Sequence, residues 1–214
     1  SWALGTGGTR FGRFPAGGEP GNLEEKIEDV GLIHHVTRAT NSISLHIPWD
    51  IPRDTAAIQQ LLAKNGLTID SVNSNTFQDQ SNQKYSYKFG SLCHTDDHIR
   101  QQAVDHNIEV VEHGIKLNSN VLTVWLADGS NFPGQHHFRR AFARTQNSLE
   151  QIYKAMPADW TMLIEYKPYE PSFYSMVIPD WGTSLQLSRA CGERANVLVD
   201  LGHHLPNTNI EQIV

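Results

Sequence analysis

The chain has 214 residues, of which 39% are hydrophobic and 19% are charged, a composition that is ordinary for a single globular domain with a sizeable core. Its 17 Lys and Arg residues against 23 Asp and Glu residues give a net charge of −6, which argues against a nucleic-acid or anionic-membrane surface. Only two Cys residues are present, Cys93 and Cys191, and they suit a protein of the reducing cytoplasm. No secretory leader or membrane-spanning apolar run is expected.

The first 40 residues predict an N-terminal loop and a short helix. Residues 1–21 are rich in Gly but follow no strand, so an irregular surface segment is favoured over a phosphate-binding loop. Residues 22–31 predict a helix with Asn22 as its N-cap.

From residue 41 onward, predicted strands alternate with predicted helices. Apolar runs indicate strands at 43–48, 67–75, 121–125, 162–164 and 197–200. Helical spacing indicates a helix at 53–65 that Gly66 ends, one that Thr95 caps, one that stops before Pro157, and one at 182–191 that Gly192 ends. A last helix is expected to include Ile213 and Val214. This alternation predicts βαβ units and a parallel sheet, with 41–214 forming five units of one incomplete domain.

Polar residues gather where each predicted strand ends. They are His46, Asn73 and Asn75, Trp125 and Asp128, Glu165 and Lys167, and Asp200 and His203. In a (β/α)₈ TIM barrel the active site lies at this face, whereas an open doubly wound sheet binds ligands near one switch point. Because every strand contributes, the pattern favours an α/β TIM barrel of which about five βα units are present.

Glu165 and Lys167 follow a buried strand and are two residues apart, so both side chains should face the same space. Pro168 then ends the strand. Charged groups in such a place are costly unless they are used or compensated. Considered alone, the pair suits an active site and a structural Glu–Lys ion pair about equally.

Asp200 and His203 follow the next strand, and with Glu165 they form a set of oxygen and nitrogen donors. Carboxylates with an imidazole suit Mn²⁺, Mg²⁺ or Zn²⁺. Because Asp200 and His203 are three residues apart, they could serve one metal through a turn or two neighbouring metals.

Five stretches in order resemble L-rhamnose isomerase, specifically the broad-specificity bacterial type that also handles rare sugars such as D-allose. The stretches are Trp2 with Gly5-Thr6-Gly7-Gly8-Thr9-Arg10-Phe11, Ser44-Leu45-His46-Ile47-Pro48-Trp49-Asp50, Asn73-Ser74-Asn75-Thr76-Phe77, residues 122–134, and residues 198–209 with Asp200-Leu201-Gly202-His203-His204. The likeness covers essentially the whole chain.

This resemblance implies a xylose-isomerase-like barrel and a cytoplasmic, homotetrameric aldose–ketose isomerase. It also implies two divalent ions, usually Mn²⁺, with Mg²⁺, Co²⁺ or Zn²⁺ as substitutes. Glu165 and Asp200 match ligands of a structural metal, and His203 matches a ligand of a catalytic metal.

The resemblance also gives roles to the residues around the metals. Lys167 matches a lysine beside the first oxygens of the sugar, and His46 matches a histidine at the sugar-ring end. Trp49, Phe77 and Trp125 match pocket walls, and Phe11 matches an aromatic that reaches the site of a neighbouring subunit. Considered without the resemblance, Trp49 and Trp125 could equally be core residues.

The chain departs from the family in two respects. Tyr166 stands where related sequences often carry His, at a position that strand alternation should turn away from the metal. The family also has a helical segment before Trp2, and three more strands after Val214 that bring another His and several Asp ligands. We therefore expect a truncated form of a larger enzyme.

Two rival functions stay open at this point. A metal-dependent endonuclease of the same barrel superfamily would use Glu, Asp and His similarly, although DNA binding should bring a basic footprint. A non-catalytic sugar-binding fragment would not need Lys167, since a neutral sugar can be bound without a cation.

Overall fold

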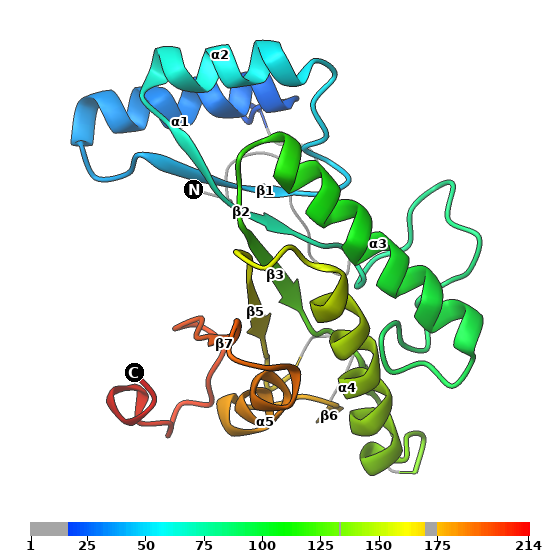
Figure 1. The fold of residues 1–214 in the computed structure, drawn as a ribbon. Coiled ribbons are helices and arrows are strands. Elements are labelled where there is room, and N and C mark those ends of the chain that lie inside the picture. The colour runs from blue at the N-terminus through cyan, green and yellow to red at the C-terminus, as the bar shows by residue number, and fades with distance from the viewer. Residues whose placement is uncertain (1–16, 133, 170–174) are drawn as a thin grey trace.

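The computed structural model describes residues 17–132, 134–169 and 175–214, and it contains a parallel sheet of five strands in the order β1-β2-β3-β5-β7 (Figure 1). The strands are β1 Ser42–His46, β2 Thr68–Asn73, β3 Val121–Trp125, β5 Thr161–Glu165 and β7 Ala195–Leu198. Neighbours in this sheet follow chain order without a reversal, so the sheet has no switch point. The predicted α/β barrel arrangement of about five βα units is confirmed.

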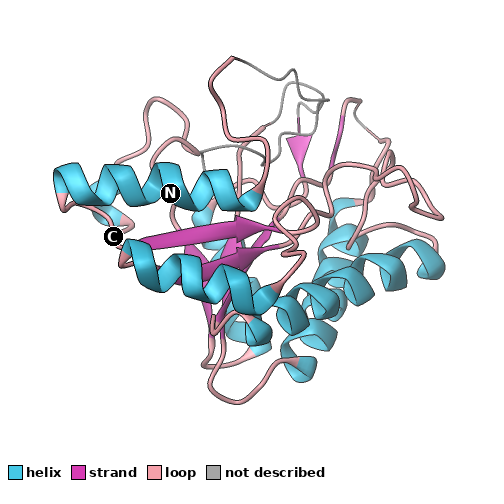
Figure 2. Ribbon diagram, turned by 90° about the horizontal axis from the view of Figure 1, so that it is seen from above, coloured by secondary structure: helices cyan, strands magenta, loops and turns pink. Residues whose placement is uncertain are grey.

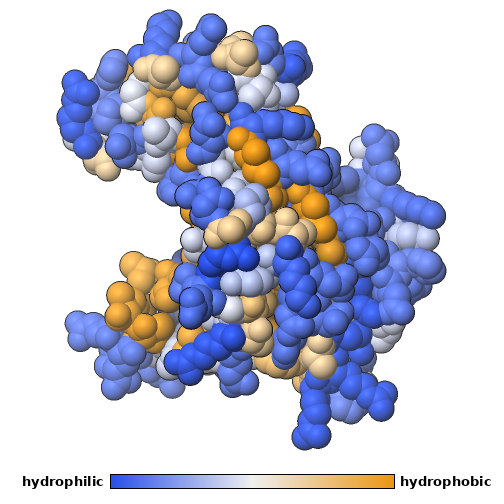
Figure 3. All heavy atoms as spheres, viewed as in Figure 1, coloured by the Kyte–Doolittle hydropathy of each residue, from blue (hydrophilic) through white to orange (hydrophobic). Residues whose placement is uncertain are grey.

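Helices cover the outer, convex side of the curved sheet, as Figures 1 and 2 show. They are α1 Leu23–Thr37, α2 Thr55–Asn65, α3 Asp97–Lys116, α4 Phe138–Ala155 and α5 Trp181–Cys191, and a 3₁₀ turn follows at Ile210–Gln212. One set of alternate strand residues, such as Leu122, Val124 and Ile164, is fully buried against them. The other set faces the hollow of the sheet, which Figure 3 shows as a concavity. No helix in the described ranges is long and apolar enough to cross a membrane.

Short polar side chains set the helix starts. Asn22 caps α1 as predicted, because its side chain accepts a hydrogen bond from the backbone N–H of Glu25. The N-cap of α3 is Asp96 and not Thr95 as predicted, since the Asp96 carboxylate accepts the N–H of His98 at 2.8 Å. Similarly, Asp54 caps α2, so this helix begins at Thr55 and not at Arg53.

Helix α1 is longer than predicted, because Gly31 lies inside it and does not end it. The helix continues to Thr37 and ends at Arg38, which has a left-handed φ of 57°. A Cβ at Gly31 would lie 2.4 Å from Oδ1 of Asn65, at the end of α2. Gly31 therefore allows α1 and α2 to approach closely, which a sequence pattern cannot distinguish from a helix stop.

Further boundaries differ from the predictions, and β1 ends at His46 and not at Pro48. β7 ends at Leu198, two residues before the predicted end at Asp200, so Asp200 lies in the turn that follows. β2 ends at Asn73 and not at residue 75. The predicted C-terminal helix is only the 3₁₀ turn Ile210–Gln212. An antiparallel pair, β4 Gly129–Ser130 with β6 Ser175–Met176, was not predicted, because two-residue strands leave no periodic pattern.

We expect Gly114→Ala to destabilise the fold by about 1–3 kcal/mol, because α3 packs too closely for a methyl group. A Cβ there would lie 2.5 Å from the Trp160 ring and 2.9 Å from Val72. Urea denaturation would measure the change. Gly182→Ala in α5 is the matched control, because its Cβ would meet only an Asp180 oxygen at 3.4 Å. Equal stabilities of the two variants would contradict the close packing.

Candidate metal and substrate site

A cavity of about 430 Å³ lies in the hollow of the sheet, toward the carboxyl ends of its strands. Residues two apart line it, because successive side chains of a strand point to opposite faces. From β5 come Leu163 and Glu165, with Lys167 beyond them, and from β7 come Leu198 and then Asp200. Glu165 and Lys167 therefore face the same cavity, as the sequence predicts.

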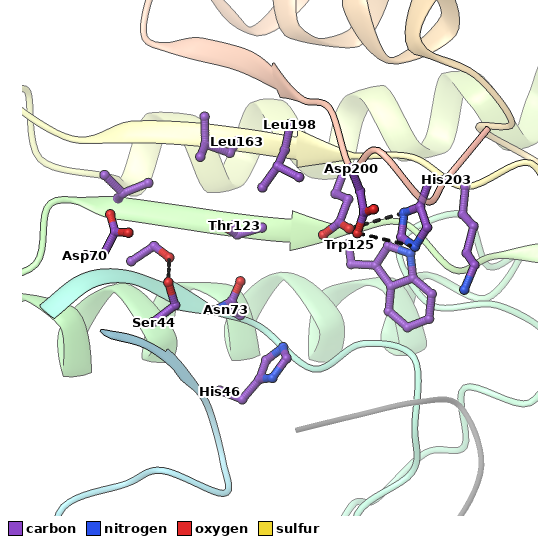
Figure 4. A pocket seen from close by; sticks show the side chains of 14 residues that line it. Ser44, His46, Asp70, Asn73, Thr123, Trp125, Leu163, Leu198, Asp200 and His203 are labelled. Atoms are coloured by element: carbon purple, nitrogen blue, oxygen red, sulfur yellow. Dashed lines mark hydrogen bonds and ion pairs between the residues drawn. The ribbon is translucent and has the colours of Figure 1, made fainter. Parts of the chain in front are cut away.

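Glu165, Asp200 and His203 converge at one end of this cavity, where Figure 4 labels Asp200 and His203. A Glu165 oxygen lies 3.3 Å from Nδ1 of His203, and an Asp200 oxygen lies 3.7 Å from Nε2 of the same ring. One ligand atom from each residue can be chosen so that all three lie within 4.8 Å of one another. This is the only such group of three or more metal-binding side chains among the described residues.

The turn after β7 makes this convergence possible. The N–H of His203 donates to the carbonyl of Asp200 at 3.0 Å, and the N–H of Gly202 donates to the Asp200 carboxylate at 2.7 Å. The turn brings two residues three apart to the same spot. His203 Nδ1 also lies 3.0 Å from the backbone oxygen of Tyr166, which fixes the ring orientation.

Negative charge is crowded at this end of the cavity. The pKa of Glu165 is raised to about 7, first by burial and then by the nearby Asp200 carboxylate, while Lys167 opposes the shift. Two carboxylates and an imidazole in a partly buried cluster are the donor set of a hard divalent cation. These three residues therefore fit a metal ion, and its positive charge would relieve the repulsion between the carboxylates.

Lys167 and Tyr166 point in opposite directions from the same segment. The ammonium of Lys167 lies 5.4 Å from the centre of the Trp125 ring, within cation–π range, and both residues line the cavity. Tyr166 is 1% exposed, and its hydroxyl lies 3.2 Å from Nε2 of His204. Tyr166 thus points away from the Glu165 cluster, as strand alternation predicts.

His46 lines the cavity from β1, at the other edge of the sheet from β7. Its ring centre lies 5.9 Å from that of Trp49 and 6.4 Å from that of Phe77. Phe77 in turn meets Trp125 edge-on at 4.6 Å. Trp49 and Phe77 pack in this aromatic cluster beside His46 and do not belong to the cavity lining, whereas Trp125 belongs to both.

The His46 imidazole is kept neutral. Its pKa is lowered to about 4, first by burial and then by the positive charge of Lys26. At neutral pH the ring therefore offers one acceptor and one donor nitrogen, and no net charge.

One predicted site residue lies outside the described residues, and one histidine has a role that the sequence did not reveal. Phe11 falls in the segment 1–16, which the structure does not describe. His106 lies on α3, and its side chain is only 15% exposed. Its Nε2 accepts the backbone N–H of Asn75 at 2.9 Å and so holds the loop that carries Phe77. No sequence signal separates this histidine from others on helix faces.

Two curated proteins are similar to this chain over its whole length. Two curated relatives named as probable sugar isomerases, from Rhizobium meliloti (strain 1021) and Mesorhizobium japonicum, are each 54% identical to this chain over 214 residues. The match covers 100% of this chain and 50% of each relative, so the chain spans half the length of the curated relatives it matches. No family model matches the chain.

Solved structures share the fold at low sequence identity. A 3-keto-D-glucoside 4-epimerase from E. coli superposes with a TM-score of 0.70 at 10% identity, over 93% of this chain and 71% of the other. An AP endonuclease, family 2, from Brucella melitensis superposes with a TM-score of 0.64 at 14% identity, over 87% and 67%. At these identities the likeness shows the fold alone, which is that of the xylose-isomerase-like barrels.

We expect the low pKa of His46 to reduce stability in mild acid. The pKa of about 4 in the folded chain lies below the ordinary histidine value of 6.5. Between these pH values the unfolded chain therefore binds a proton that the folded chain does not. Relative to His46→Gln, the wild-type chain should lose up to about 3 kcal/mol as the pH falls from about 6.5 to about 4.

Urea denaturation at a series of pH values would measure this difference. The contribution of Glu165, which has the opposite sign, cancels because both proteins carry it. Parallel stability curves for the two proteins, or an NMR titration of the His46 ring near pH 6.5, would contradict the prediction.

Proposed function

We propose that the whole protein containing these residues is a metal-dependent aldose–ketose isomerase. The observation that carries the proposal is the convergence of Glu165, Asp200 and His203 at one end of a cavity, with Lys167 beside them and His46 at the opposite strand edge. The names of the two curated relatives support the same chemistry.

The reaction converts an open-chain aldose into a ketose by moving hydrogen between C1 and C2. Glu165, Asp200 and His203 would hold a divalent cation. When bound, this cation would polarise the sugar oxygens as a Lewis acid and would orient them as a template. Lys167 would place its ammonium near the first sugar oxygens and stabilise the negative charge that develops there. Its fixed position over Trp125 prepares the charge before substrate arrives.

His46 would assist ring opening at the far end of the sugar. Because its pKa is lowered to about 4, it is neutral near pH 7. A neutral imidazole can accept the proton of the anomeric hydroxyl as the carbonyl forms and the bond from that carbon to the ring oxygen breaks. It can then donate this proton to the ring oxygen, so His46 would begin as the general base. The aromatic cluster of Trp49, Phe77 and Trp125 would exclude water beside it.

The substrate proposal rests on the sequence resemblance. It is L-rhamnose with L-rhamnulose as the product, and D-allose with D-psicose as a related pair. The same resemblance suggests two ions, with Mn²⁺ the preferred metal, and a cytoplasmic tetramer. Discrimination among sugar epimers depends on contacts worth about 1–3 kcal/mol each, so substrate preference is the part of the proposal most sensitive to single side chains.

The isomerase is favoured over the two rivals for separate reasons. The net charge of −6 provides little of the positive surface that DNA binding requires. A passive sugar-binding module has no use for a lysine held beside two carboxylates and an imidazole. A Mn²⁺ titration separates the module from the enzyme, because only the enzyme needs the metal.

We expect Lys167→Met in the whole protein to lower kcat by about 10²–10³, the usual effect of removing one preorganised charge-stabilising donor. Mn²⁺ affinity, measured by calorimetry, should change little, because a cation cannot be a metal ligand. Lys88→Met is the matched control: its ammonium lies 5.5 Å from the Phe89 ring, in a similar cation–π contact outside the cavity. An unchanged kcat in Lys167→Met would remove Lys167 from the mechanism.

We also expect residues 1–214 on their own to have no measurable isomerase activity. Three ligand side chains are too few for two hard cations, which need more oxygen donors. In the described part of the chain, β1 and β7 each pair on one side only, so the cavity is open to water at the sheet edges.

The test is to add excess Mn²⁺ to residues 1–214 and to assay conversion of L-rhamnose or D-allose to its ketose. The whole protein serves as the positive control. Turnover of residues 1–214 at a comparable rate would show that the account of incomplete ligation is wrong.

A further inference from the structure

A buried ion pair lies behind the His46 end of the cavity. The ammonium of Lys26, on α1, lies 2.6 Å from a carboxylate oxygen of Asp50, and both side chains are 1% exposed. Lys26 stands on the buried face of α1, where Leu23, Ile27 and Val30 are its neighbours along the helix. A lysine on an apolar helix face is unusual enough to need a specific explanation.

The same Asp50 oxygen closes the turn that carries His46. It accepts the backbone N–H of His46 at 2.8 Å, and the N–H of Asp50 donates to the carbonyl of His46 at 2.8 Å. Within this turn of residues 46–50 lie His46 and Trp49, whose rings meet edge-on. The position of one carboxylate therefore determines how the turn leaves β1 and where both rings point.

Stability alone explains this ion pair poorly. Removing two charges from water costs about as much as their attraction returns, and apolar replacements of buried pairs are often neutral or stabilising. What an apolar pair cannot do is hold a hydrogen-bond acceptor at a fixed point under the backbone of His46. We therefore assign the ion pair a role in the geometry of the turn and not in the stability of the fold.

We propose that Asp50 is a positioning residue of the active site: its carboxylate, whose buried charge Lys26 balances, sets the turn 46–50 and aims His46 at the sugar. The proposal rests on the proposed function insofar as it assigns His46 to the sugar. Lys26 itself touches no substrate, because it lies on the outer side of the sheet with α1.

Electrostatics support the same assignment. The Lys26 charge is the second cause, after burial, of the lowered His46 pKa. Lys26 thus acts on His46 in two ways, through the hydrogen-bonded turn and through its field, and both favour a neutral, fixed imidazole.

The experiment compares two double variants in the whole protein. Lys26→Met/Asp50→Asn removes both charges but keeps a side-chain oxygen that can accept the His46 N–H. Lys26→Met/Asp50→Ala removes the charges and the acceptor together. Ile27→Ala, a fully buried neighbour on the same helix, is the control for lost stability alone. The readouts are kcat and KM with Mn²⁺, thermal midpoint, and the crystal structure around His46.

We expect Lys26→Met/Asp50→Asn to keep kcat within about fivefold of wild type, since a neutral buried replacement is often tolerated. Lys26→Met/Asp50→Ala should lower kcat by about 10²-fold with little change in KM, the usual cost of a 1 Å misplacement. In its crystal structure the imidazole should be displaced from Trp49 and Phe77. Ile27→Ala should lower the thermal midpoint and leave kcat unchanged.

Two failures are distinguishable. If the wild-type protein does not isomerise sugars, the proposed function fails, and the two crystal structures still decide whether the side-chain oxygen at Asp50 positions His46. If Lys26→Met/Asp50→Ala keeps the wild-type kcat, or keeps the His46 ring in place, the positioning role is wrong.

Discussion

The register of the parallel strands is the constraint on which the rest of the site depends. Trp125 of β3 is paired with Glu165 of β5, and Glu165 is paired with Leu198 of β7. Because side chains alternate, this register places Trp125, Glu165 and Leu198 on the cavity side together, with Lys167 two residues on. A slip of one residue in β5 would turn Glu165 and Lys167 toward the helices and bring Ile164 to the cavity.

The two edges of the sheet provide opposite electrostatic environments. At the β7 edge, burial and the neighbouring Asp200 raise the pKa of Glu165 to about 7, so this end attracts a cation or a proton. At the β1 edge, burial and Lys26 lower the pKa of His46 to about 4, so this end stays neutral. A sugar isomerase needs both environments, because charge develops at the first two carbons while proton transfer serves the ring oxygen.

Local patterns in the sequence were sufficient to locate the five strands of the main sheet and to single out Glu165, Asp200 and His203, because both depend on apolar runs and alternation within short segments. Glu165, Asp200 and His203 each follow an apolar run, and parallel strands end at one edge of a sheet. Features that depend on contacts between residues distant in sequence could not be predicted from local patterns. From the sequence Gly31 indicates the end of a helix, whereas in the structure it allows the close approach of Asn65 from α2. The pairing of Lys26 with Asp50 likewise joins residues 24 positions apart, and no periodicity marks it.

In barrels of this kind, the strand ends usually carry chemistry and the outer helices usually carry stability. The ion pair between Lys26 and Asp50 departs from that division, since a charge from an outer helix reaches the backbone of an active-site turn. Burying two charged side chains costs free energy, which is explained here if the ion pair fixes the position of the turn. The turn 46–50 is short, with its side chains packed against an aromatic cluster, so a small shift of α1 would be transmitted to the imidazole. If His46 acts on the sugar as proposed, the outer layer is part of the catalytic geometry at the β1 edge, whereas at the β7 edge the turn after the strand is sufficient by itself.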